Sequence, residues 1–157
     1  IYGGFLEHIG NLINHSLWSE VLDDRKFYFG VLEKPDEKPT ERRAARNYIN
    51  KWIAIGPMSA FSLDTKNAYV GEHSPSIKLS GSLRGIMQHN LALAAKQYQG
   101  RVVLSSDAAT PVTISLIWGD AKSDRASVDI DSTTDWQTKT FTLACPVETV
   151  TGRIEIT

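Results

Sequence analysis

The stretch Val112-Thr113-Ile114-Ser115-Leu116-Ile117-Trp118 places Val112, Ile114, Leu116 and Trp118 at every second position. In a β-strand, successive side chains point to opposite faces, so this spacing predicts a strand with one buried face. We therefore expect Val112, Ile114 and Leu116 to lie inside the protein. Trp118 stays in phase with them, and we expect it to pack in the core as well.

Similar short apolar runs recur on both sides of this strand. They cover residues 61–63, 77–79, 91–93, 102–104, 128–130, 141–143 and 154–156, and turn-forming residues separate them at 64–67, 80–82, 119–120 and 133–135. Many short strands at this spacing are typical of an antiparallel two-sheet sandwich. The sequence therefore predicts a mainly β fold, a jelly-roll sandwich over residues 51–157, with Phe141 and Leu143 also inside.

The composition argues against several classes of protein. The 157 residues carry a net charge of -1 with no basic stripe, which gives no sign of a nucleic-acid partner. Polar residues interrupt the longest apolar run, within residues 101–118, so no membrane span is expected. The histidines lack zinc-ligand spacing and no glycine loop suits a phosphate, so we expect neither metal nor cofactor. Cys145 has no cysteine partner in the chain, and we expect it to be buried.

The first 29 residues differ from this β-rich part. Residues 1–6 are apolar and contain two glycines, like a buried strand, and Glu7 and His8 follow at its end. Ser16 fits a helix N-cap, and apolar residues then recur at helical spacing. We expect one strand, a loop and a helix over residues 1–29. An exposed linker follows over residues 30–50, where two prolines stand among charged residues.

The segment Ile1–Gly10, with the continuation Leu17–Phe27, resembles the first barrel strand and the following stretch of α-L-arabinofuranosidases of glycoside hydrolase family 51. Residues 64–77 and 85–91 resemble the stretch of family 51 enzymes that carries an inserted module. The sandwich itself is similar to carbohydrate-binding modules of families 4 and 9. The resemblance implies that residues 1–29 are the first βα unit of a (β/α)8 barrel. Because strand-like patterns lie at both ends of the chain, we expect it to be a piece of a longer enzyme.

The resemblance implies a retaining hydrolase that releases terminal α-L-arabinofuranose from arabinan or arabinoxylan. Such enzymes use two carboxyl groups about 5 Å apart, and no segment here resembles either catalytic motif. We therefore expect no catalytic residue in this chain, and the remainder of the barrel in another polypeptide segment. Glu7 matches the family glutamate that binds arabinose hydroxyls, with pairing to a barrel arginine as the alternative. His8 is a packing group or, alternatively, a direct sugar contact.

Aromatic residues of the sandwich are candidate sugar contacts, because sugar rings present apolar C–H faces. Trp52 and Trp118 each lie in a strand pattern and fit the core better. Tyr69, in a loop-like stretch, and Trp136, after a turn, are the better candidates, with a structural role as the alternative for both. Since no cluster of aromatic residues emerges from the pattern, we expect any sugar affinity to be weak.

Two other functions remain open from the sequence. The chain fits a non-catalytic carbohydrate-binding protein in which residues 1–50 pad the sandwich. It also fits a family 51 member that acts on β-glucan backbones. In each case the partner is a polysaccharide or oligosaccharide, arabinose-containing in the main interpretation, and a homo-oligomer is compatible with the sequence.

We expect Glu7→Gln to lower catalytic efficiency on an aryl arabinofuranoside when the whole barrel is present. The amide keeps the shape of the side chain but loses its charge, and each hydrogen bond to a charged group contributes about 1.5–3 kcal/mol. Steady-state kinetics measure the effect. Wild-type efficiency in the variant would assign Glu7 a structural role.

Overall fold

The computed structural model describes residues 21–41 and 48–157. Within these residues the regular structure is almost all β. The elements are β1 (Ile53–Ile55), the 3-10 helix η2 (Met58–Ala60), β2 (Phe61–Asp64), β3 (Ser74–Ile77), β4 (Gly85–Leu93), β5 (Lys96–Leu104), β6 (Thr110–Ile117), β7 (Arg125–Ser132), β8 (Gln137–Cys145) and β9 (Thr149–Ile156). No helix among the described residues is long and apolar enough to cross a membrane.

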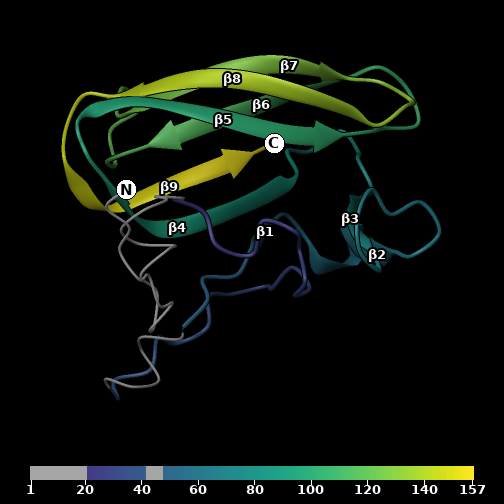
Figure 1. Cartoon of the computed structure of the whole chain (residues 1–157), viewed down its shortest axis with the longest axis horizontal. Helices are drawn as coiled ribbons and strands as arrows, with labels where there is room; N and C mark the ends of the chain where they lie inside the picture. Colours follow the sequence, from purple (N-terminus) through teal and green to yellow (C-terminus); the bar gives the residue numbers. More distant parts are fainter. Residues whose placement is uncertain (1–20, 42–47) are drawn as a thin grey trace, which may run out of the picture.

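Two layers of unequal width form the protein. Strands β1-β4-β9-β6-β7 make a five-stranded sheet in which all neighbours are antiparallel. Strands β5 and β8 make a two-stranded ribbon, which Figure 1 shows lying over the larger sheet. The hairpin β2–β3 lies beside one end of these layers, at the right of Figure 1. The predicted antiparallel sandwich is therefore confirmed.

The core lies between the two layers. Ile114 and Leu116 of β6 pack with Leu143 of β8, and each is at most 5% exposed. Phe141 and Trp118 are half-buried and pack against the same cluster. Cys145 is buried there with a free thiol. The alternation in β6 thus predicted the core face correctly.

Two features of β6 differ from simple alternation. Ser115 and Ile117, which alternate with the core residues of β6, are buried as well, and Ser115 Oγ lies 2.8 Å from Ser127 Oγ of the neighbouring β7. Val112, which was expected inside, is instead half-buried outside the core cluster. It lies near the start of β6, where the end of the sandwich is open and forms the wall of a groove.

Residues 21–32, here called the strap, lie on the sandwich in an irregular conformation. None of them is helical, so the described part of the expected barrel unit does not show its helix. Val21 and Leu22 are nevertheless half-buried against the core cluster, so their apolar character did indicate burial. The strap ends in a parallel bridge between Leu32 and Ile53. Glu7 and His8 lie outside the described residues.

A fully buried amide joins the strap to β4. The side chain of Gln88 is 0% exposed. Its Oε1 accepts a hydrogen bond from the Asp23 amide at 2.9 Å, and its Nε2 donates to the carbonyl oxygens of Asp23 at 3.1 Å and Asn50 at 2.8 Å. One side chain therefore satisfies backbone groups from two distant segments, which would otherwise be left unpaired beside the core.

Aromatic stacking and a hydrogen-bonded turn also attach the strap to the sandwich. The ring of Phe27 stacks on Trp52 at 5.3 Å between centroids, and Trp52 Nε1 donates to the Asp24 carbonyl. Trp52 is thus buried, as predicted. Burial raises the pKa of the Asp24 carboxyl above its usual 3.8, while hydrogen bonds from the amides of Tyr28 and Phe29 oppose the rise. The turn is therefore held by the hydrogen bonds from two backbone amides to Asp24 and by the stacking of Phe27 on Trp52.

We expect Gln88→Met to lower the free energy of unfolding by about 2–3 kcal/mol, because similar volume is kept but partly buried backbone groups lose their partner. Chemical denaturation measures the change, and hydrogen exchange should show faster exchange at the Asp23 amide. Gln137→Met, at an exposed glutamine of β8, is the control and should change stability by less than about 0.5 kcal/mol. Equal effects of the two variants would contradict the role given to Gln88.

Candidate functional site

A groove of about 740 Å³ lies at the end of the sandwich beside the β2–β3 hairpin. We call it the rim groove. It is formed by the hairpin, the start of β4, the β5–β6 loop, the start of β6 and the β7–β8 loop. Its lining residues include Asp64, Asn67, Ser74, Ser76, Ile77, Lys78, Leu79, Arg84, Leu104, Ser105, Ser106, Asp107, Thr110, Val112, Thr134, Trp136 and Ile156.

Trp136 lines this groove and contacts a second aromatic side chain, Tyr69, from a distant part of the sequence. Tyr69, in the β2–β3 loop, lies 5.5 Å from Trp136, in the β7–β8 loop, with the rings tilted by 48°. Tyr69 is 52% exposed and Trp136 is half-buried. The indole Nε1 donates to Asn67 Oδ1 at 3.3 Å, which fixes the edge of the indole and leaves its faces to pack. The pair forms an apolar surface within a polar rim.

The β2–β3 loop is shaped by hydrogen bonds of its own. Asp64 Oδ1 accepts from the amides of Lys66 and Asn67, the pattern of an Asx turn. Farther along, the Tyr69 amide donates to Ser74 Oγ at 3.1 Å. These contacts connect the two ends of the loop across the hairpin, so Tyr69 is carried on an ordered turn.

A buried serine holds the opposite wall. Ser132, 3% exposed, donates from Oγ to the Thr110 carbonyl at 3.0 Å, and its Oγ lies 2.7 Å from Ser106 Oγ. The Ser106 amide in turn donates to the Thr133 carbonyl at 2.8 Å. These bonds join the β5–β6 loop to the end of β7, immediately before the loop that carries Trp136. No pattern in the sequence indicated these serines, because none belongs to a recognisable motif.

The hairpin is also tied to the strap. The ring of His73, next to β3, is bonded through Nε2 to the Phe27 carbonyl at 2.8 Å. Phe27 is stacked on Trp52, so this bond connects the loop of Tyr69 to the buried part of the protein. The groove is therefore supported by the turn at Asp64, by the hydrogen bonds of Ser132 and by this contact with the strap.

The lining of the rim groove suits a neutral polar ligand that has one apolar face. Hydroxyl and amide groups line it beside the indole of Trp136, and both donors and acceptors are present. Its four charged residues, Asp64, Lys78, Arg84 and Asp107, balance. Among the described residues no group of three or more His, Cys, Asp or Glu could hold a metal ion. Such a lining suits binding by stacking and by hydrogen bonds.

The predicted site residues thus divide into two groups. Tyr69 and Trp136, predicted separately as candidate sugar contacts, contact each other, and Trp136 lines the groove. Glu7 and His8 fall outside the described residues, so their predicted contacts stay predictions. Tyr98, another aromatic residue of the sandwich, is half-buried at a different groove.

The fold is that of carbohydrate-binding modules. A structure described as "CBM4 structure and function" superposes with a TM-score of 0.55 over 86% of this chain and 86% of that chain, at 13% identity. TmCBM61, solved in complex with β-1,4-galactotriose, gives a TM-score of 0.56 over 88% of this chain and 86% of that one, at 16% identity. No protein-family model and no curated protein matches the sequence. The likeness therefore lies in the fold.

We expect a coupling energy of about 0.5–1 kcal/mol between Tyr69 and Trp136 in a double-mutant cycle of Tyr69→Leu and Trp136→Leu. The tilted rings contact each other, so each substitution should cost less once the other ring is gone. Chemical denaturation of the four proteins measures the coupling. Tyr28→Leu, at a 77% exposed tyrosine, replaces Tyr69→Leu in the control cycle and should be additive with Trp136→Leu. Additivity in both cycles would show that the pair is not formed in solution.

Proposed function

We propose that this protein binds carbohydrate at the rim groove, as a non-catalytic recognition module. The observation that supports this most is the Tyr69–Trp136 pair beside a polar groove. An aromatic face packs against the C–H face of a sugar ring, while hydroxyl and amide side chains bond its hydroxyl groups. The sandwich fold shared with carbohydrate-binding modules adds to this support.

The carboxylates of the groove favour recognition over bond cleavage at this place. Asp64 Oδ1 is occupied by two backbone amides, so this carboxylate shapes the loop. Asp107 is exposed in the neighbouring loop. Glycoside hydrolysis needs two carboxyl groups, and with Asp64 committed to the turn Asp107 is the remaining carboxylate among the described lining residues of the groove.

Isothermal titration against xylan, arabinan and β-1,4-galactan oligosaccharides tests this function. We expect binding to at least one of them with a dissociation constant above about 10 µM, or about -7 kcal/mol, because only two aromatic rings are presented. Trp136→Ala should weaken that binding at least about tenfold, equivalent to about 1.4 kcal/mol, since it removes the stacking face. Tyr69→Ala should act in the same direction with a smaller effect.

The matched control is Tyr28→Ala, at an exposed tyrosine of the strap that does not line the groove. It should bind each sugar as the wild type does. Binding that all three variants retain in full would place the sugar elsewhere on the molecule. Absence of binding to every oligosaccharide and to the parent polysaccharides would contradict the proposed function.

We further propose that this module serves an α-L-arabinofuranosidase that acts on arabinan or arabinoxylan. The support is the resemblance of residues 1–29 and 64–91 to family 51 enzymes. The second of these stretches includes the hairpin that carries Tyr69 and lines the rim groove. A module inserted in such an enzyme would hold the polysaccharide near the barrel that cleaves it.

Release of arabinose tests this second proposal. The full-length protein should hydrolyse an aryl α-L-arabinofuranoside and release arabinose from arabinan or arabinoxylan. Hydrolysis of β-glucan backbones in place of these substrates would favour the alternative family 51 activity. Sugar binding with no hydrolysis of either kind would leave the chain a binding protein and refute the enzymatic proposal.

A further inference from the structure

The charged residues of the rim groove are separated along the β2–β3 hairpin. Asp64 lies at the loop end of the hairpin, opposite Ser74, whereas Lys78 directly follows β3 at the other end. A strand rises about 3.3 Å per residue, so about 13 Å of chain separates Ser74 from Lys78. Arg84 lies at the Lys78 end, because its Nη1 donates a hydrogen bond to the Lys78 carbonyl. The groove is thus neutral in sum but has a cationic end, which Lys78 and Arg84 both line.

The two carboxylates of the groove belong to the loops around Trp136. Asp64 accepts from the amide of Asn67, and Asn67 Oδ1 in turn accepts from Trp136 Nε1. Asp107 follows Ser106, which is bonded to the end of β7, immediately before the loop that carries Trp136. The groove therefore has an aromatic end that bears the carboxylates, and a separate cationic end.

Arg84 is positioned by the protein, but its hydrogen-bonding capacity is not used up. Gly56 has a φ of 115°, and a Cβ there would come within 3.3 Å of Arg84 Cγ, so the glycine leaves room for the arginine stem. Arg84 Nε is buried without a hydrogen-bond partner, and neither Arg84 nor Lys78 is in an ion pair among the described residues. A guanidinium has five N–H donors. Arg84 therefore retains donors and an unpaired charge for a ligand at the groove.

We propose that this cationic end makes the rim groove select oligosaccharides that carry a carboxylate, with a neutral sugar unit against Trp136 and a uronic acid unit at Arg84 and Lys78. The inference rests on the proposed carbohydrate binding and names the class of sugar. Hydrogen bonds between a guanidinium and a carboxylate are shorter than those to a neutral hydroxyl group and about twice as strong. Lys78 adds a second positive charge at the same end. A wholly neutral chain would leave both cations without a counter-charge.

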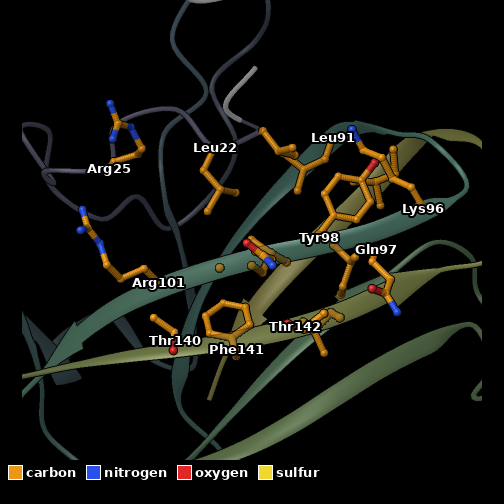
Figure 2. A pocket seen from close by; sticks show the side chains of 17 residues that line it. Leu22, Arg25, Leu91, Lys96, Gln97, Tyr98, Arg101, Thr140, Phe141 and Thr142 are labelled. Carbon is orange, nitrogen blue, oxygen red and sulfur yellow. The ribbon is translucent and has the colours of Figure 1, made fainter. Parts of the chain in front are cut away.

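A second groove, of about 890 Å³ beside β5, also carries cations and offers a comparison. Figure 2 shows Arg101 near one end of it and Lys96 near the other. Its aromatic rings are already packed. Lys96 Nζ lies 5.1 Å from the centre of the Tyr98 ring, and the ring of Phe141 occupies the space that a side chain at Gly100 would need. This groove therefore has positive charge without the exposed aromatic pair of the rim groove.

Titration of the full 157-residue chain with matched pairs of oligosaccharides tests the proposal. One pair is a xylo-oligosaccharide with a glucuronic acid branch and the same molecule with its carboxyl group reduced to the alcohol. The other pair is trigalacturonate and its carboxyl-reduced form. We expect the acidic member of at least one pair to bind at least about fivefold tighter at low salt, as for one exposed ion pair, and the difference to shrink at high salt.

Substitutions at the cationic end should act on the acidic sugar alone. Arg84→Gln should weaken the acidic form about fivefold and change the reduced form by less than about twofold, and Arg84→Lys should recover part of the loss. Lys78→Gln, at an exposed side chain, should act in the same direction and keeps the test valid if Arg84→Gln lowers stability. Lys66→Gln is the control, because it makes the same change of charge at an exposed lysine of the hairpin loop that does not line the groove.

Trp136→Ala separates this proposal from sugar binding itself, because stacking does not depend on the charge of the sugar and both forms should weaken by the same factor. Equal affinity of the acidic and reduced forms would overturn the acid preference while sugar binding stands, and absence of binding by all four sugars would overturn both. Loss of the preference in Arg101→Gln in place of Arg84→Gln would assign the carboxylate to the groove beside β5. Tighter binding of a sulfated form of the same oligosaccharide would assign the cationic end to sulfate esters, and either result refutes a uronic acid at Arg84.

Discussion

The side chain of Gln88 is the interaction on which the arrangement of the rest depends. β4 brings a buried amide to the surface of the core, and this amide accepts from and donates to the backbone of Asp23 and also donates to the Asn50 carbonyl. A hydrocarbon at this position would remove the partner of those partly buried groups, at a total cost of about 2–3 kcal/mol. The sandwich therefore has a specific attachment for a segment 65 residues away along the chain. Apolar contact alone would not set its register.

From this attachment, support extends to the groove through direct contacts. The strap places Phe27 on Trp52, and the Phe27 carbonyl holds His73 of the hairpin. The hairpin carries Tyr69 to Trp136. Each contact is modest by itself, and together they order loops that have little core of their own. A recognition surface on loops gains affinity from such order, because less conformational entropy is lost on binding.

Sequence patterns predicted the sandwich and the individual aromatic residues, but not their assembly. The period of two in β6 depends on local geometry, so Ile114 and Leu116 could be placed in the core directly. Tyr69 and Trp136 could be recognised as aromatic residues in turns, whereas their contact depends on the packing of distant hairpins. The apolar spacing at Val21 and the preceding residues predicted a helix, yet at Val21 it marks burial in an irregular segment. Hydrophobic spacing reports which residues are buried more reliably than the backbone form in which they are buried.

The two walls of the rim groove are closed by separate sets of local bonds. The turn at Asp64 satisfies the β2–β3 loop from within, and the bonds between Ser106 and Ser132 join the β5–β6 loop to the end of β7. Loops of this kind tolerate substitution and changes in length far better than the strands that carry them. Substitutions in one loop, away from the contact of Trp136 with Asn67 and Tyr69, can thus leave the bonds of the other loop and the core in place. The groove has the modular construction from which a lineage of proteins with different ligand preferences can diverge on one scaffold.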